Sequence, residues 1–190
     1  EDGIMVEVWT VTVTIAPNSE TDITVFSFTE QTSEVTPNST THTIDIEVGY
    51  GTDVSSLTPN ITLSPNATIS PASGVAQNFT SPVTYTVTAE DGSTTEIWTM
   101  SVTVAAPNME TDITAFSFTE QTGAVTPNTS THTIDIEVAY GTDVSSLTPT
   151  ITLSPNATIS LASGVAQGFT SPVTYTVTAE DGSTTQDWMV

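Results

Sequence analysis

The chain of 190 residues contains no lysine, no arginine and no cysteine, whereas it has 22 acidic residues and two histidines. Its formal net charge at pH 7 is therefore −22. Because nucleic-acid phosphates are contacted mainly by lysine and arginine, this composition excludes nucleic-acid binding as a primary role. The same absence argues against adhesion to anionic lipid. Without cysteine no disulfide can form, and without lysine no isopeptide cross-link is available.

Long hydrophobic runs are also missing. No apolar stretch approaches the roughly 18 residues that a membrane-spanning helix needs, so we expect no membrane insertion. With almost no side-chain ion pairs available, stability must come from apolar burial and backbone hydrogen bonds. Salt screens the repulsion between carboxylates, and a salty or divalent-rich environment would therefore suit this surface.

A nearly exact internal repeat dominates the sequence. Residues 21–100 align with residues 111–190 without gaps at a period of 90, and 67 of the 80 positions are identical. Such copies predict two tandem domains, which we assign to residues 17–106 and 107–190. Residues 1–15 align with residues 90–104, so we assign residues 1–16 to an N-terminal donor or linking strand.

Each copy has the pattern of an all-β fold. Apolar and polar residues alternate from Val83 to Val104 around Asp91-Gly92, which predicts a long hairpin. Residues 41–48 alternate strictly, and a short strand is expected at 75–79. We predict two tandem immunoglobulin-like β-sandwich domains of about seven strands each. The expected core of the first copy consists of Phe26, Phe28, Ile44, Ile46, Leu63, Val75, Phe79, Tyr85, Val87 and Trp98.

Several motifs of the chain resemble a known class of repeats. They include Thr-Asp-Ile-Thr-Ala-Phe-Ser-Phe-Thr-Glu-Gln-Thr, His-Thr-Ile-Asp-Ile-Glu-Val-Ala-Tyr-Gly-Thr-Asp and Ser-Pro-Val-Thr-Tyr-Thr-Val-Thr-Ala-Glu-Asp-Gly with the closing Trp. The chain is similar over essentially its whole length to tandem Ig-like modules of very large cell-surface proteins of Bacteroidetes and flavobacteria. This resemblance implies an extracellular adhesin stalk or surface filament, and it implies no catalytic residues.

The two ends of the chain differ from the complete repeat in opposite ways. The counterpart of Ser101–Val104 is absent from the second copy, whereas residues 1–15 repeat the turn and return arm of the hairpin. We therefore predict that the N-terminal strand of one chain completes the second domain of another. The predicted polymerisation strand comprises Met5, Trp9, Val11, Val13 and Ile15, and the predicted acceptor groove comprises Tyr175, Val177 and Trp188.

Two interpretations of this arrangement remain open. In the first, the chain is a subunit that polymerises head to tail into a homopolymer by strand exchange. In the second, it is a segment of a longer array whose neighbouring residues supply the missing strand covalently. Both interpretations make the N-terminal strand part of a preceding domain.

Calcium is the only cofactor that the sequence suggests. Hard cations prefer clusters of oxygen ligands, and acidic residues gather at the start of each repeat and in the hairpin turns. The candidate calcium ligands are Glu20, Asp22, Asp91, Glu110, Asp112 and Asp181. The alternative is a solvated acidic surface, because the spacing matches no known calcium loop.

No catalytic residues are predicted. His42 and His132 are the only imidazoles, and we expect each to lie at the edge of a core rather than in a metal or catalytic site. No nucleophile-elbow motif accompanies the many serines, so the chain is not expected to be an enzyme. The function predicted is structural, as part of an extracellular filament or adhesin stalk. The alternative is an adhesion module that binds carbohydrate or a protein through loops such as Tyr50–Asp53.

Overall fold

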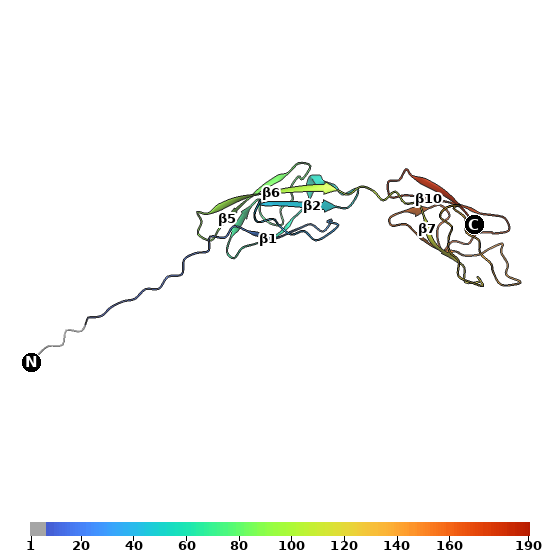
Figure 1. Cartoon of the computed structure of the whole chain (residues 1–190), viewed down its shortest axis with the longest axis horizontal. Helices are drawn as coiled ribbons and strands as arrows, with labels where there is room; N and C mark the ends of the chain where they lie inside the picture. Colours follow the sequence, from blue (N-terminus) through green and yellow to red (C-terminus); the bar gives the residue numbers. More distant parts are fainter. Residues whose placement is uncertain (1–6) are drawn as a thin grey trace, which may run out of the picture. The chain divides into compact units, whose positions relative to one another are not determined.

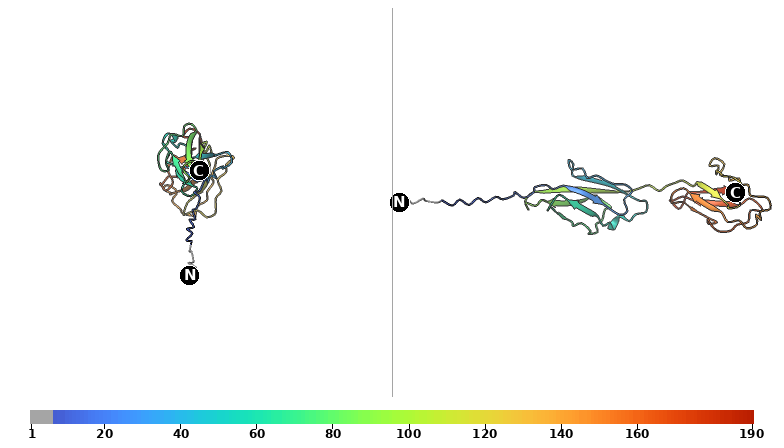
Figure 2. Two further views of the ribbon diagram at one scale, coloured as in Figure 1. Left: turned by 90° about the vertical axis from the view of Figure 1, so that its left-hand side faces the viewer. Right: turned by 90° about the horizontal axis from the view of Figure 1, so that it is seen from below.

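The computed structural model describes residues 7–190, and the chain divides into two compact units, Glu1–Ala105 and Ala106–Val190. We call them unit 1 and unit 2. Both are built from β-strands, with no α-helix among the described residues (Figures 1 and 2). Within that part of the chain no helix has the length and apolarity to cross a membrane. The prediction of an all-β fold is confirmed.

Unit 1 is a β-sandwich whose two sheets enclose one core. A two-stranded antiparallel sheet, β1-β3, faces a four-stranded sheet with the order β2-β6-β5-β4, and side chains from both sheets form the core. The strands of unit 1 are β1 (Ile23–Ser27), β2 (Thr43–Val48), β3 (Asn60–Leu63), β4 (Thr68–Ser70), β5 (Val83–Thr88) and β6 (Thr95–Val104), with one short 3-10 helix, η1 (Val54–Ser56).

The hairpin β5–β6 forms as the sequence predicts. Gly92 adopts a positive φ of 68°, which a residue without a Cβ tolerates, and the Asp91 carboxylate accepts hydrogen bonds from the backbone N–H groups of Ser93 (2.8 Å) and Thr94 (2.7 Å). Tyr85 and Trp98 stand opposite each other in the antiparallel register. The period of two thus places both of these aromatic side chains in the core.

Strand β6 lies between β5 and β2 in the larger sheet. Its first half pairs with β5, and its second half pairs in parallel with β2, so that Ile46 lies opposite Val102 and Val48 opposite Val104. Figure 1 shows β2 and β6 side by side. Because the second half of β6 covers β2, Ile46 and Val48 are fully buried.

Aromatic side chains join the two sheets of each unit. In unit 1, Phe26 from β1 packs edge-on against Tyr85 from β5, with ring centroids 5.7 Å apart. In unit 2, Phe116 and Tyr175 repeat the contact at 5.5 Å. Such edge-to-face pairs stabilise a core beyond the area that they bury. The two units therefore share one packing scheme.

Unit 2 differs from unit 1 on one side of its larger sheet. Its strands are β7 (Ile113–Ser117), β8 (Thr150–Leu153), β9 (Thr158–Ile159), β10 (Thr174–Thr178) and β11 (Thr185–Met189). They form the sheets β7-β8 and β11-β10-β9, and residues 134–138, the counterpart of most of β2, form no strand. Only Thr133 keeps a parallel bridge, with Met189, and the Ile134 N–H donates to the Met189 carbonyl at 2.9 Å.

The described residues hold six strands in unit 1 and five in unit 2, fewer than the seven expected for each. The predicted strand at 75–79 is wrong, because only Gln77 forms a bridge there, with Leu57. Val75, expected in the core, is 48% exposed, since the turn at Gly74 (φ 77°) precedes it and directs the chain along the surface. Leu63 is only partly buried. The other predicted core residues of unit 1 are buried.

Candidate functional site

The most exposed aromatic side chain of the described residues belongs to Tyr140, in a tight loop that follows residues 134–138. Tyr140 is fully exposed, whereas its counterpart Tyr50 is 44% exposed. Gly141 has a positive φ of 86°, and the Thr142 N–H donates to the Ala139 carbonyl at 3.1 Å, so the chain turns sharply beneath the ring. The loop thus presents a flat aromatic face and a phenol hydroxyl to solvent.

A carboxylate lies three residues after each of these tyrosines. The Asp143 carboxylate accepts a hydrogen bond from the Ser145 N–H at 2.9 Å, and Asp53 makes the same contact with Ser55. Hydrogen bonds to the charged form lower the pKa of both carboxyl groups, so both are ionised at neutral pH. An exposed aromatic face and an ionised acceptor in one loop suit a ligand with C–H faces and hydroxyl donors.

A glutamate ties the start of each unit to its hairpin. The Glu90 carboxylate accepts hydrogen bonds from the Asn18 backbone N–H (2.9 Å) and the Asn66 side-chain amide (3.0 Å). Glu180 does the same in unit 2 with Asn108 (2.6 Å) and Asn156 (2.9 Å). The entry of each repeat is therefore stapled to the hairpin turn by charged hydrogen bonds.

The carboxylates expected to bind calcium in the turns already have partners. Asp91 and Asp181 each accept backbone N–H groups within their own turn. For Asp91 the hydrogen bond from the Thr94 hydroxyl contributes most, and together with the backbone N–H groups it lowers the pKa of the carboxyl to about 2. Hydrogen bonds within the turn also lower the pKa of Asp181 well below its usual range.

The remaining candidate ligands stay near the entry of each unit. Glu20 and Glu110 each donate their backbone N–H to the asparagine two residues earlier, and the backbone of Asp22 and of Asp112 contacts a serine hydroxyl. Across residues 7–190 no three or more acidic or histidine side chains form a group that could hold a metal ion. Calcium binding stays a prediction.

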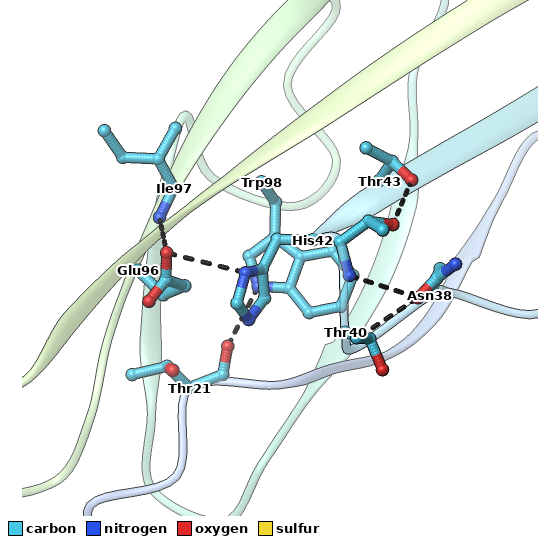
Figure 3. Close-up of polar contacts among 9 residues, drawn as sticks. Thr21, Asn38, Thr40, His42, Thr43, Glu96, Ile97 and Trp98 are labelled. Atoms are coloured by element: carbon cyan, nitrogen blue, oxygen red, sulfur yellow. Dashed lines mark hydrogen bonds and ion pairs between the residues drawn. The ribbon is translucent and has the colours of Figure 1, made fainter.

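The two histidines lie at the end of the core, next to the closing tryptophans. The His42 ring packs edge-on against Trp98 at 5.2 Å, and its Nδ1 is 3.5 Å from a Glu96 carboxylate oxygen (Figure 3). The Trp98 indole N–H donates to the Thr21 carbonyl at 3.0 Å. His132 and Trp188 repeat the ring contact. The expectation that these histidines lie at the edge of the core is confirmed.

The predicted polymerisation strand is not buried in its own chain. Between residues 7 and 16 the backbone forms no strand, and its large apolar side chains are between 83 and 94% exposed. These side chains belong to Val8, Trp9, Val11, Val13 and Ile15. Met5, the other predicted member, lies outside the described residues.

The predicted acceptor residues are buried within unit 2. Tyr175, Val177 and Trp188 have no exposed surface, because β10 and β11 pair with each other and bury all three in the core of unit 2. The open groove lies beside residues 134–138 instead, with a volume of about 340 Å³. Its apolar lining includes Ile136, Val138, Leu147 and Phe169. The position of this groove depends on the parallel pairing seen between β2 and β6 in unit 1, which the residue pattern of neither segment predicts.

Two solved structures of Bacteroides proteins are similar to parts of the chain. A provisionally assigned glycoside hydrolase from Bacteroides thetaiotaomicron shares 36% identity over 65% of this chain, with a TM-score of 0.42. The chain spans only 36% of the length of that protein. A provisionally assigned secreted protein from Bacteroides fragilis has 21% identity, covers 46% of this chain and 98% of its own length, and gives a TM-score of 0.35. No curated protein matches the chain.

A family model matches most of the chain. The model described as "SGBP, N-terminal", from the glycan-binding surface proteins of Bacteroidetes, matches residues 23–104 and again residues 113–190. Each match lies within one of the two units of the fold. The chain therefore belongs to the SGBP N-terminal family and is a cell-surface, extracellular protein with two copies of that domain.

Proposed function

We propose that this chain is a cell-surface module that binds a glycan through the loop of Tyr140, with the loop of Tyr50 as a second, weaker site. The observation that carries the proposal is the fully exposed Tyr140 ring in a chain of the SGBP family. The apolar C–H face of a pyranose packs against an aromatic ring, while the phenol hydroxyl and the Asp143 carboxylate supply the polar contacts.

The charge of the chain restricts the class of glycan. A net charge of −22 without a single lysine or arginine repels uronate and sulfate groups, and no guanidinium is available to pair with them. The proposed ligand is therefore a neutral oligosaccharide or polysaccharide. The whole surface favours it over an acidic glycan, and this preference weakens as salt is added.

The test is a titration of the full chain with a panel of neutral oligosaccharides (maltoheptaose, cellohexaose and xylohexaose), with oligogalacturonate as the acidic control. We expect one neutral class to bind and the acidic one not to bind. Tyr140→Ala should weaken binding about tenfold or more, whereas Tyr140→Phe, which keeps the ring, should retain most of the affinity. Equal affinity of wild-type chain and Tyr140→Ala would rule out this loop as the site.

A second candidate function is structural, as a segment of a surface stalk or filament. The near identity of the two units favours it, because the aromatic core contacts recur at equivalent positions, and so do the hydrogen bonds that Glu90 and Glu180 accept from the start of each unit. A repeated module with one packing scheme extends a chain without adding a new specific site. The family is a binding family, and no step of catalysis is proposed for any residue.

A further inference from the structure

A groove in unit 1 lies between strand β1 and the segment that follows it. Its volume is about 400 Å³, and its lining comes from Val25–Ser27 of β1, from Gln31 and from Glu34–Thr36. Sites for small ligands have volumes of about 300–1,000 Å³. None of the lining residues belongs to the loop of Tyr50, so the groove is separate from the tyrosine loops discussed above.

The strand that borders the groove has a free edge. Strand β1 pairs only with β3, and outside that ladder no backbone group of Val25–Ser27 forms a hydrogen bond with the described residues. Such an edge offers N–H and C=O groups to a ligand. The groove follows β1 for only three residues, about 10 Å, whereas a paired strand usually has about 5–6 residues. A small ligand therefore fits it better than an added peptide strand.

The side chain of Gln31 is held in place at the groove. Its Oε1 accepts the Phe28 backbone N–H at 2.9 Å, and its Nε2 donates to the Ser33 carbonyl at 2.9 Å. The second N–H of the amide has no protein partner and is available to a ligand. Gln121 makes the same two hydrogen bonds in unit 2. The backbone frame around this amide is therefore the same in both units.

The two units differ in the side chains that this frame carries. Three of the 13 positions at which the aligned copies differ lie here, two in the lining of the groove and one directly before Glu34. These positions are Val25, Ser33 and Glu34, and their counterparts are Ala115, Gly123 and Ala124. The groove of unit 1 thus has an isopropyl group and a carboxylate where unit 2 has two methyl groups.

The Glu34 carboxylate has no cationic partner. Glu34 is the only charged residue of the lining, and its side chain forms no ion pair within residues 7–190. The chain has no lysine or arginine to offer, and the one histidine close to a carboxylate in that range, His42, lies next to Glu96. The net charge of −22 also attracts cations to the whole surface. A ligand that brings its own ammonium group would supply the missing partner.

We propose that this groove binds a short glycan in which a sugar ring carries a free amino group. The protonated amine donates to the Glu34 carboxylate, sugar hydroxyls contact the Gln31 amide and the free edge of β1, and the C–H face of the ring packs against Val25. The class of ligand, a glycan, rests on the proposed function. The site and the positive charge of its ligand are independent of the tyrosine loops.

The test compares two disaccharides that share their rings and differ at the amine. One is a disaccharide of glucosamine, protonated in slightly acidic buffer, and the other is its N-acetylated form. In titrations of the full chain the free amine should bind about tenfold or more tightly than the N-acetylated form. Glu34→Gln keeps the shape of the side chain and should abolish this difference. Glu30→Gln removes the same charge from an exposed position outside the lining and should preserve it.

Unit 2 supplies a test by gain of binding. The triple variant Ala115→Val, Gly123→Ser and Ala124→Glu gives unit 2 the side chains of the unit 1 groove. No atom lies within 4 Å of the place that a Cβ at Gly123 would take, so the added side chain fits. We expect the number of sites that bind the amine form to rise from about one to about two per chain.

Three results would overturn the proposal. Equal affinity for the two disaccharides would show that the amine is not recognised. An equal loss in Glu30→Gln and Glu34→Gln would show that only the general negative charge attracts it. A lysine dipeptide that binds as tightly as the amino sugar would show that the groove does not select a glycan. The neutral oligosaccharides that test the Tyr140 loop carry no amine, so either proposal can fail while the other holds.

Discussion

The two core tyrosines differ from the other buried polar side chains because their hydroxyl groups have no partner. Among the described residues, the only buried side-chain polar atoms without a hydrogen bond are the hydroxyl oxygens of Tyr85 and Tyr175. Burial raises the pKa of both to about 12. The ring packs against phenylalanine, whereas the hydroxyl is a desolvated group that contributes nothing in return.

Replacing Tyr85 by phenylalanine should therefore stabilise unit 1, by about 1 kcal/mol. That change corresponds to a rise in melting temperature of roughly 4–8 °C for a domain of this size. The raised pKa has a further consequence: burial disfavours the phenolate, so stability is unaffected by this group below a pH of about 10 and is lost as the pH rises toward about 12. Thermal melts at neutral and alkaline pH should show that Tyr85→Phe lacks this loss.

Replacing the closing tryptophan by phenylalanine should change the stability of unit 1 in the opposite direction, so it serves as the control. Trp98 is as buried as Tyr85, but its indole N–H is bonded to the Thr21 carbonyl. Trp98→Phe removes that bond and leaves a void, so it should destabilise unit 1 by about 2 kcal/mol. If both phenylalanine variants shifted the melt in the same direction, hydrogen-bond satisfaction would not be the cause.

The turn carboxylate of Asp91 should remain largely ionised until the pH approaches about 2. Hydrogen bonds from Thr94 and Ser93 lower its pKa to about 2, below the value of about 3.9 in an unfolded chain. Its contribution to stability is thus present above pH of about 4 and disappears as the pH falls toward about 2. A carbon NMR titration of the carboxyl groups measures this directly.

Asp91→Asn isolates this contribution from the rest of the surface. Protonation of the other carboxylates relieves repulsion and acts in the opposite direction, so only the difference between variant and wild type is informative. That difference in urea midpoint should shrink between pH of about 4 and about 2. A constant difference over this range would show that the aspartate acts through turn geometry alone.

At the scale of elements, the sequence predicts features that depend on neighbouring residues and misses pairings between strands far apart in the chain. The turn at Asp91-Gly92 depends on neighbours in the chain and forms as predicted. Residues 43–48 also form the expected strand, but the identical residues 133–138 do not, so alternation alone does not decide the pairing. The failed strand at 75–79 has an apolar pattern but no neighbouring strand that supplies a full ladder. The parallel pairing of β2 with β6 is likewise invisible in the local pattern, because it joins residues more than fifty positions apart.

The same substitution placed in both copies measures the effect of this missing ladder. Ile46→Ala should destabilise unit 1 by about 2–5 kcal/mol, since Ile46 is buried in the core and its strand pairs with the second half of β6. Ile136→Ala should cost unit 2 roughly half as much, because the side chain is already partly exposed. Hydrogen exchange in urea, read by mass spectrometry, reports the two units separately. Equal losses would mean that residues 135–138 are covered in solution.

At the scale of the whole molecule, carboxylates without cationic partners set the response to salt. Raising sodium chloride from about 10 mM to about 1 M shortens the screening length from about 30 Å to about 3 Å. Every charged side chain of the surface other than the two histidines is acidic, so screening should raise the melting temperature of both units. Lithium or potassium chloride should act equally well, and a melting temperature that falls with salt would contradict this account.

Calcium should add to this screening only if the entry of each unit is a specific site. At matched ionic strength, calcium chloride would then raise the melting temperature more than sodium chloride does, and a chelator would reverse the gain. Glu20→Gln together with Asp22→Asn should abolish the additional rise in melting temperature, because these residues follow Asn18, whose backbone N–H donates to Glu90. Glu34→Gln with Asp45→Asn removes the same charge from other exposed positions and should leave it intact. Identical curves in the two salts would refute the site and leave a solvated acidic surface.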